Sequence, residues 1–185
     1  MTKDQSKMGL GELLSGVEDA SLSWGSDEES AGSSEARIPL LRFRVEGDAF
    51  AVEAAHVREI VGRVSLTALP GAPAHIRGIM VLRRQVVGVL DLGRFLKLDR
   101  LDATVAIGPS AARIVILETA LFTVGIYVDQ VEGLDSWPQS AVQAHDVPES
   151  ISKRTRSFAR AARFEDESLT ILLNIEKLLD DAAVR

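Results

Sequence analysis

The chain has 185 residues and a mass of 20.0 kDa, enough for one domain or for two very small ones. Apolar residues make up 46% and charged residues 26%, values typical of a folded domain in water. The absence of cysteine excludes disulfides, thiolate metal sites and a cysteine nucleophile. No apolar run reaches the ~18 residues of a membrane-spanning helix, and the polar residues 1–7 lead into no signal-peptide stretch. We therefore expect a cytoplasmic protein without direct membrane insertion.

The net charge of −6 is concentrated at the N-terminus. Residues 1–37 carry three basic and eight acidic side chains, a net charge of −5, which leaves −1 for the rest. This nearly neutral body argues against nucleic acid as a partner. Since residues 1–37 are rich in Ser, Gly, Asp and Glu, they predict a disordered acidic tail ahead of a folded domain at residues 38–185. A partly helical disordered segment, or a short docking helix, is indicated within the tail by Leu10, Leu13, Leu14 and Val17.

From residue 39 onward, short β-type runs alternate with turn residues. In residues 41–45 apolar side chains alternate with arginines, the pattern of a half-buried strand, and Gly47-Asp48 follows as a candidate hairpin turn. Further strands are predicted at residues 50–52, 76–82, 86–92, 114–117, 122–128, 158–164 and 169–173. A helical turn is predicted at residues 93–98, and a closing helix after the capping residue Asn174. Many short strands with one convincing helix predict an all-β fold, and two small closed barrels would avoid exposed sheet edges.

Motifs for catalysis are scarce. His56, His75 and His145 show no metal-ligand spacing, and the chain has no phosphate-binding glycine loop and no nucleophile elbow. Asp91 and Asp129 each follow an apolar strand, where they could perform acid–base catalysis if they converged on a cleft. Alternatively, each accepts backbone hydrogen bonds at the end of its strand. We favour this second interpretation and predict no enzyme activity, no catalytic residue, no cofactor and no metal.

A basic run near the C-terminus could bind phosphate or an acidic partner. Acidic residues follow it at once, and few aromatic side chains are interleaved for stacking on bases. We therefore interpret it as a solvated loop and strand face. Its members are Lys153, Arg154, Arg156, Arg160 and Arg163.

Several motifs occur in a fixed order along the body of the chain. Val-x-Glu-Ile occurs at residues 57–60, Pro-x-x-Ile-x-Gly at residues 73–78, and Val-Gly-x-x-Val-Asp-x-Val at residues 124–131. Together with residues 43–52, 82–92 and 171–179, they resemble the CheW family, the adaptor domain of bacterial chemosensory arrays. The resemblance covers about residues 39–181 and none of the tail.

This resemblance implies two packed five-stranded SH3-like β-barrels with a short C-terminal helix. It also implies a non-catalytic adaptor that couples the cytoplasmic tip of a chemoreceptor to the regulatory domain of a CheA-type histidine kinase, with other CheW-like proteins as further partners. An alternative is a CheW-like module that binds receptors or positions arrays without ordinary kinase coupling. The receptor-binding residues carried over by position or proximity are Val57, Arg83, Arg84, Arg113, Gly125 and Leu134. The kinase-binding residues carried over are Glu59 and Gly78.

Two departures from the family pattern affect the receptor-binding residues. The family's Asn-Leu-Arg-Gly stands here as Val81-Leu82-Arg83-Arg84, and Arg113 lies near a usually apolar position. Since glycine is best suited to positive φ, we expect its loss to change the geometry of this hairpin tip. The sequence thus predicts a divergent member, paired with a particular receptor or lacking ordinary kinase coupling.

Overall fold

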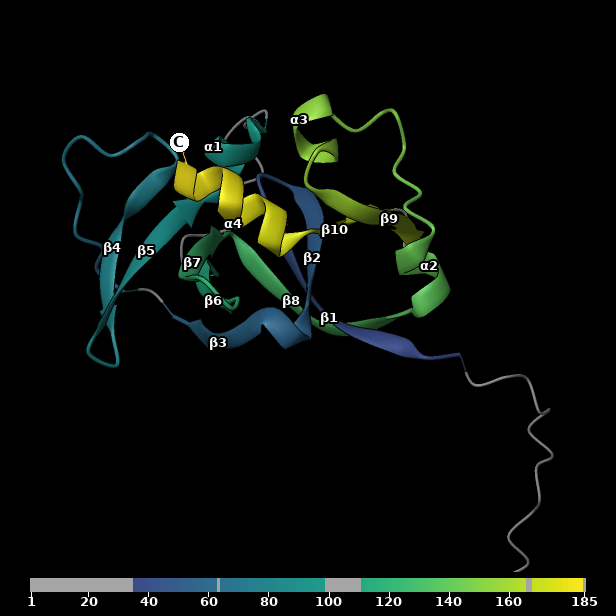
Figure 1. Cartoon of the computed structure of the whole chain (residues 1–185), viewed down its shortest axis with the longest axis horizontal. Helices are drawn as coiled ribbons and strands as arrows, with labels where there is room; N and C mark the ends of the chain where they lie inside the picture. The colour runs from purple at the N-terminus through teal and green to yellow at the C-terminus, as the bar shows by residue number, and fades with distance from the viewer. Residues whose placement is uncertain (1–34, 63, 99–110, 166–167, 185) are drawn as a thin grey trace, which may run out of the picture. The chain divides into compact units, whose positions relative to one another are not determined.

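The computed structural model describes residues 35–62, 64–98, 111–165 and 168–184 (Figure 1). Apart from its last three residues, the predicted acidic tail lies outside this part of the chain, and so does the amphipathic segment at residues 10–17. Arg37, the last residue of the predicted tail, is the first residue of strand β1.

The described residues form mostly strands. The elements are β1 (Arg37–Val45), β2 (Asp48–Glu53), the 3-10 turn η1 (Ala54–His56), β3 (Val57–Val61), β4 (Ile76–Leu82), β5 (Gln85–Asp91), α1 (Leu92–Leu96), β6 (Arg113–Glu118), β7 (Thr123–Val128), β8 (Gln130–Pro138), α2 (Gln139–Gln143), α3 (Lys153–Arg156), β9 (Ala159–Glu165), β10 (Ser168–Leu173) and α4 (Ile175–Val184). Every strand predicted from an apolar run is present, and the helical turn predicted at residues 93–98 is α1. The elements β3, β8, η1, α2 and α3 were not predicted.

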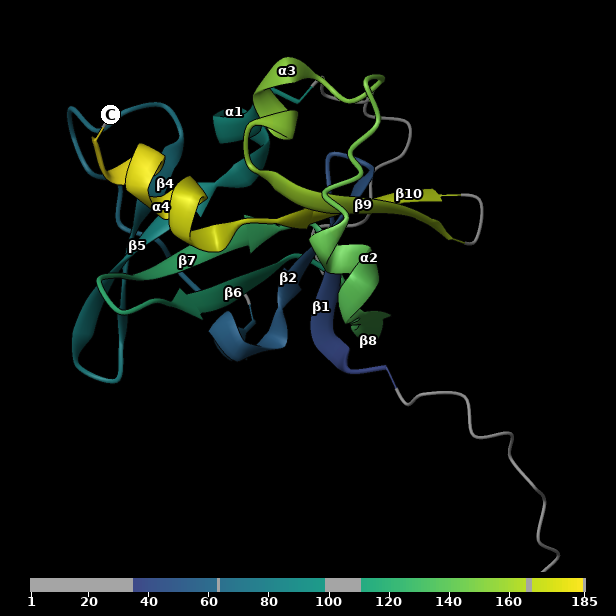
Figure 2. The same cartoon turned by 45° about the vertical axis from the view of Figure 1, so that its right-hand side comes forward.

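The strands form two five-stranded sheets, which confirms the predicted all-β fold (Figures 1 and 2). Sheet A has the order β8-β1-β2-β10-β9, and sheet B has the order β3-β6-β7-β5-β4. Neighbouring strands are antiparallel except for β2–β10 in sheet A and β5–β7 in sheet B. Sheet B uses consecutive strands of the chain, whereas sheet A combines the first two strands with the last three.

Three groups of buried side chains show how the sheets pack. One cluster draws on both sheets and includes Phe43, Phe50, Val115 and Ile126. A second cluster is confined to sheet A and α2, around Trp137, and a third is confined to sheet B. Adjacent residues of one strand face different clusters, because side chains alternate across a strand. In β6, for example, Val115 and Leu117 join the shared core, whereas Ile114 and Ile116 join the core of sheet B.

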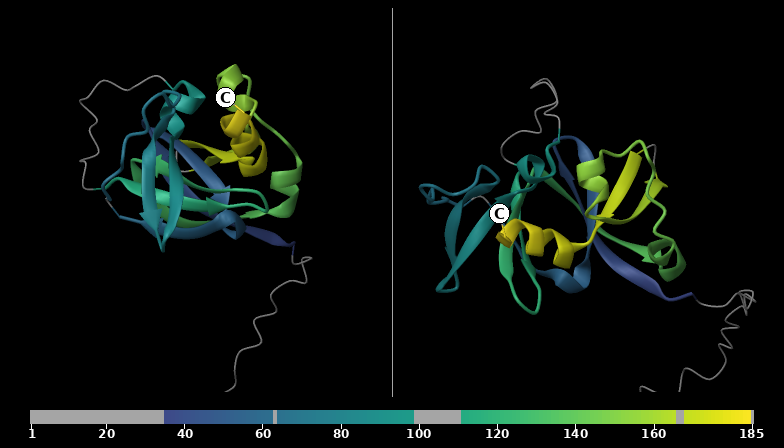
Figure 3. Two further views of the ribbon diagram at one scale, coloured as in Figure 1. Left: turned by 60° about the vertical axis from the view of Figure 1, so that its left-hand side comes forward. Right: turned by 45° about the horizontal axis from the view of Figure 1, so that its top comes forward.

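Helix α4 packs on the shared core and lies across the region between the two sheets (Figure 3). Its apolar residues Ile175, Leu178 and Leu179 are buried, as the sequence predicts. The side chain of Asn174 accepts a hydrogen bond from the backbone N–H of Lys177 at 3.0 Å, so the predicted helix cap is confirmed.

Neither sheet is closed into a barrel by backbone hydrogen bonds, since each keeps two edge strands. In sheet A the edge strands β8 and β9 both contact α2, which lies against them in place of a further ladder. In sheet B the edge strand β4 receives a two-hydrogen-bond bridge between Thr67 and Ile79, at 2.8 and 2.9 Å. The predicted closed barrels are thus two strongly curled sheets whose edges are covered by other segments.

The first hairpin turn lies one residue earlier than predicted. Val45 pairs with Asp48, so Glu46 and Gly47 are the two turn residues, with φ of 51° and 90°. Positive φ at both positions is the type I′ arrangement that matches the twist of a hairpin. The register follows from the pairing of Phe43 with Phe50, both fully buried, which outweighs the turn preference of Gly47-Asp48.

The C-terminal basic run is not the solvated face that we expected. Arg154 donates from Nε to the carbonyl of Phe95 at 3.2 Å and from Nη2 to Asp181 at 3.2 Å. Its guanidinium also lies 4.6 Å and 4.9 Å from the ring centroids of Phe95 and Phe158. Arg160 forms an ion pair with Glu53 of β2. Arg154 therefore joins α3, α1 and α4, and periodicity cannot reveal this because its partners are far apart in sequence.

Replacing Arg154 with Ala is expected to lower the free energy of unfolding by about 1–3 kcal/mol, since both ring contacts and the bond to Asp181 are lost. Chemical denaturation of the two proteins measures the difference. Arg156→Ala on the same helix is the control and is expected to change stability by less than about 0.5 kcal/mol. Equal effects of the two substitutions would contradict the assignment.

Candidate protein-binding surface

Arg83 and Arg84 occupy the tip of the β4–β5 hairpin, which projects at the lower left of Figure 1. Leu82 pairs with Gln85, so the two arginines are the whole turn. Their φ angles are 48° and 69°, both in the left-handed region that favours glycine. The prediction that the loss of glycine would change this geometry is wrong. The strand register imposes a two-residue turn with positive φ, and Arg84 adopts the strained conformation.

The tip is tied to strand β3 by an ion pair. Arg83 Nη2 donates to Glu59 Oε2 at 3.3 Å, and Arg83 Nε lies 3.2 Å from Glu59 Oε1. The arginine side chain is 69% exposed, and the glutamate side chain only 23%. An ion pair this accessible adds little to stability, but it holds the Arg83 guanidinium beside the Glu59 carboxylate. A predicted receptor-binding residue and a predicted kinase-binding residue are thereby brought into contact, across the two edge strands of sheet B.

Gly78, the other residue predicted to bind the kinase, has a clear role in the fold. It has a φ of 147°, and a Cβ atom there would lie 2.6 Å from the carbonyl oxygen of Thr67. The close approach of Thr67 to β4 thus depends on the absence of a side chain. A substitution at Gly78 would displace the bridge that covers this edge of sheet B.

Gly125 is buried inside sheet B. A Cβ atom on it would lie 2.6 Å from Cγ2 of Ile114 and 3.4 Å from Cγ2 of Val89. The contact with Ile114 is closer than atoms tolerate, so the adjacent strand would have to shift. Its position therefore has a packing explanation, independent of any partner.

The other predicted receptor-binding residues lie apart. Val57 packs against the shared core, whereas Leu134 is 78% exposed on the edge strand β8. Arg113 lines a cavity of about 300 Å³ in sheet B together with Arg77 and Tyr127, whose ring lies 3.7 Å below the Arg77 guanidinium. None of the three cavities described for this chain is lined by Val57, Gly125 or Leu134.

Two apolar features escaped the sequence analysis. Val81 and Val86, directly opposite each other in the β4–β5 ladder, are 73% and 68% exposed. An apolar cavity of about 180 Å³ lies between α4 and sheet B, and its lining includes Phe122 and Leu179. The valines could have been recognised from the alternation in β4 and β5, because their neighbours Met80 and Val87 are the buried residues of that hairpin. No local signal reveals the cavity, since α4 joins it from the far end of the chain.

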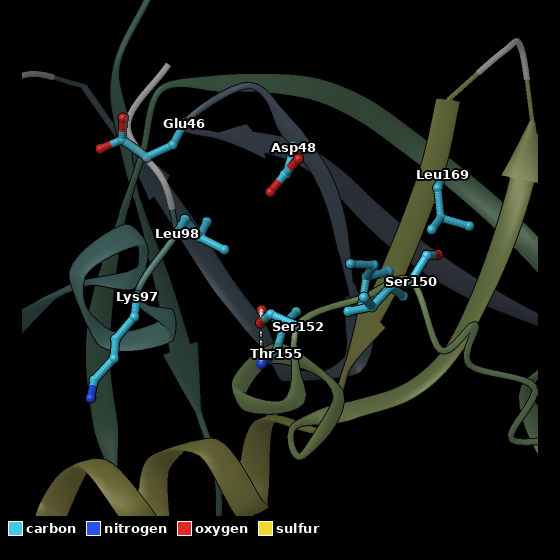
Figure 4. Close-up of a pocket in the computed structure, with 10 residues that line it drawn as sticks. Glu46, Asp48, Lys97, Leu98, Ser150, Ser152, Thr155 and Leu169 are labelled. Atoms are coloured by element: carbon cyan, nitrogen blue, oxygen red, sulfur yellow. Dashed lines mark hydrogen bonds between the residues drawn. The ribbon is translucent and has the colours of Figure 1, made fainter. Parts of the chain in front are cut away.

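Another pocket, of about 390 Å³, lies between the β1–β2 turn, α1 and α3 (Figure 4). Two of its hydroxyl groups are bonded to each other, because Ser152 Oγ donates to Thr155 Oγ1 at 3.0 Å; Ser152 Oγ also accepts from the Thr155 N–H at 3.1 Å. The ammonium group of Lys97 points away from Asp48. No nucleophile and base converge in this pocket, which therefore offers no arrangement for catalysis.

Asp91 and Asp129 bind backbone groups near the ends of their strands, as we favoured. Asp91 Oδ1 accepts from the N–H of Arg94 at 3.0 Å, and its Oδ2 lies 3.0 Å from Arg77 Nη1. Asp129 Oδ2 accepts from the N–H of Glu46 at 2.6 Å. Neither carboxylate lines any of the three cavities.

Within the described ranges, no group of three or more His, Asp or Glu side chains could hold a metal ion. His145 Nδ1 lies 2.9 Å from the carbonyl oxygen of Arg160, and the His75 ring packs edge-on against Phe95. In the same part of the chain, no helix is both long and apolar enough to cross a membrane.

A two-sheet β-domain with a projecting charged hairpin and exposed apolar side chains at its edges has the features of a protein–protein interaction domain. The sequence matches the model of the CheW-like domain family over residues 39–183. The chain belongs to the CheW family, whose members are non-catalytic chemotaxis scaffolds.

Individual relatives agree with this assignment. The chain is 30% identical over 143 residues to a protein of Rhizobium etli named "Probable chemotaxis protein CheW", covering 77% of this chain and 87% of that one. It is 27% identical to the chemotaxis protein CheW of Bacillus subtilis, covering 72% and 81%. The crystal structure of the scaffolding protein TtCheW from Thermoanaerobacter tengcongensis has the same fold, with a TM-score of 0.67 at 20% identity, covering 82% of this chain and 93% of that one.

Gly125→Ala is expected to lower the free energy of unfolding by about 1–3 kcal/mol, because the added methyl group collides with Ile114. Gly88→Ala on the adjacent strand is the matched control, since a Cβ there meets nothing within 4 Å. Thermal unfolding compares the variants. A stable Gly125→Ala protein would rule out the packing explanation.

Asp48→Asn is expected to raise the melting temperature at pH 7. Partial burial raises the pKa of the Asp48 carboxyl, so the folded state binds the proton more tightly than the unfolded state does. Ionisation therefore lowers stability as the pH rises from the unfolded pKa to the folded one. The gain in melting temperature should disappear below both pKa values. Melting temperatures measured between pH 3 and 8 test this pH dependence, with the substitution Glu149→Gln at an exposed residue as control. A gain that persisted undiminished in acid would contradict it.

Proposed function

We propose that this chain is a chemosensory adaptor that couples chemoreceptors to a CheA-type histidine kinase in signal transduction for motility. It would act in the cytoplasm, in association with receptor arrays. In this proposal residues 38–185 are the adaptor domain and residues 1–37 an acidic tail. The observation that carries the proposal is the ion pair between Arg83 and Glu59, since the two residues belong to the proposed receptor-binding and kinase-binding sets.

Receptor binding is assigned to exposed groups and to residues that shape their surroundings. Arg83, Arg84 and Leu134 are exposed and would contact the receptor directly. The remaining assigned residues, Val57, Arg113 and Gly125, are partly or fully buried and would act mainly by holding the strands in place. Glu59 and Gly78 are assigned to the kinase, Glu59 through its carboxylate and Gly78 through the conformation of β4.

A second candidate function keeps the receptor and omits the kinase. In this alternative the chain binds receptors or positions arrays without ordinary kinase coupling. Two observations favour it: Arg83 already engages the Glu59 carboxylate, and Arg84, the next residue, adds a second positive charge to the turn. Co-elution of the full-length chain with a receptor fragment but not with the kinase regulatory domain would support the alternative. Co-elution with neither would contradict both proposals.

Arg83→Glu is expected to weaken binding of a purified receptor fragment at least about tenfold, because the change reverses the charge presented at the tip. Glu59→Lys is expected to weaken binding of the kinase regulatory domain to a similar extent. Calorimetry with each partner measures both effects. Lys177→Glu, an exposed charge reversal on α4, is the control and should change neither affinity.

The double variant Arg83→Glu with Glu59→Lys separates contact from positioning. The exchanged charges can pair again, so the tip should keep its attachment to β3. If the residues contact the partners directly, both affinities stay low in the double variant. Recovery of both affinities would contradict direct contact and leave the ion pair a positioning role.

A further inference from the structure

The two arginines of the β4–β5 turn differ in what they contact. Arg83 is bound to Glu59, whereas Arg84 is exposed and makes no hydrogen bond or ion pair with any described residue. Both have positive φ, a conformation that glycine adopts at much lower cost than arginine does. The fold thus gains nothing evident from arginine at position 84. A strained residue at an exposed tip is a reason to look for a function outside the fold.

The surroundings of Arg84 add an apolar surface. Val81 and Val86 are opposite each other in the ladder, and their side chains therefore lie on the same face of the hairpin. That face is the exposed one, because Met80 and Val87 turn the other face into the core of sheet B. We call Val81, Arg84 and Val86 the tip patch.

The local charge is also unbalanced. Two arginines meet a single carboxylate at the tip, that of Glu59, in a domain whose body has a net charge of only −1. An exposed guanidinium within three residues of two exposed valines of the same hairpin is complementary to a carboxylate flanked by apolar side chains. A basic surface on the partner would leave the charge of Arg84 unpaired. A purely polar surface on the partner would leave the two valines without an apolar contact.

We propose that the tip patch recognises a receptor segment with a carboxylate beside exposed apolar side chains, and that Arg84 determines specificity for that segment. This inference rests on the proposed receptor-binding function. It goes further in naming the chemistry of the partner and in assigning a separate task to each arginine. Arg83 orients the tip through Glu59 and adds to the general receptor-contacting surface, whereas Arg84 selects the segment that binds.

Arg84→Gly tests the proposal because stability and binding should change in opposite directions. Glycine relieves the strained backbone, so the melting temperature is expected to rise. The ligand is the cytoplasmic fragment that binds best among those purified from the source organism's chemoreceptors. Removal of the guanidinium is expected to weaken binding of this fragment about tenfold. The affinity for the kinase regulatory domain should stay the same. Arg84→Lys, which keeps the charge without the fork, should lie between the wild type and Arg84→Gly.

A second measurement identifies the partner group. When the acidic residues of that receptor fragment are changed to their amides one at a time, one change should remove the affinity difference between wild type and Arg84→Gly. The double variant Val81→Ser with Val86→Ser should bind the same fragment more weakly. The salt dependence of binding should not change, because no charge is lost.

The outcomes distinguish this inference from the proposed function. Unchanged receptor affinity in Arg84→Gly would overturn the specificity role, and if Arg83→Glu still weakened binding, the adaptor function would stand. Unchanged affinity in both variants would contradict receptor binding through this hairpin altogether. A fall in both stability and binding for Arg84→Gly would show that arginine serves the fold, and would also overturn the inference.

Discussion

The central strands of this domain have to bury both of their faces, because one face fills the sheet's own interior and the other meets the opposite sheet. Val115 and Ile116 of β6, adjacent in sequence, are both fully buried and belong to different cores. Such strands cannot carry a binding residue without disturbing one core or the other. The positions open to a partner are therefore edges and turns, where the proposed binding residues Leu134, Glu59 and the two arginines of the β4–β5 turn lie. In the proposed function, the buried glycine Gly125 would affect partners only through the position of its strands.

The sheet edges are covered by side chains and short segments, and this has a consequence for the adaptor. The edge strands β3 and β4 of sheet B are linked through Thr67 and through the Arg83–Glu59 ion pair, both of which can be rearranged more easily than a continuous ladder. A partner that draws Arg83 away would release the Glu59 carboxylate for another contact. Signal transfer between two binding partners needs a connection that has two arrangements. This ion pair is the described contact best placed to provide one.

The sequence was informative where burial follows a period and uninformative where contacts join distant segments. The strands of both sheet interiors were evident from apolar runs. Strand β8 was missed because polar residues and glycine interrupt its apolar pattern. It is held by a backbone ladder to β1 and by ion pairs such as that of Arg42 Nη2 with Glu132 Oε2 at 3.3 Å. The turn at Arg83-Arg84 was misjudged since strand register outweighs residue preference. The family resemblance named Arg83 and Glu59 separately, but their contact spans 24 positions and required the fold.

The two sheets also differ in how they can be made on the ribosome. Sheet B is encoded without interruption from β3 to β7 and can pair its strands as soon as that stretch has emerged. In sheet A, β2 cannot complete its pairing until β10 has been synthesised. Phe50 of β2 pairs with Ile171 of β10, and most of the domain's sequence lies between them. Pairings that distant in sequence are slow to form. During synthesis, the half with the β4–β5 hairpin is therefore complete first. The apolar surface of the future shared core stays uncovered until the last strand and α4 leave the exit tunnel.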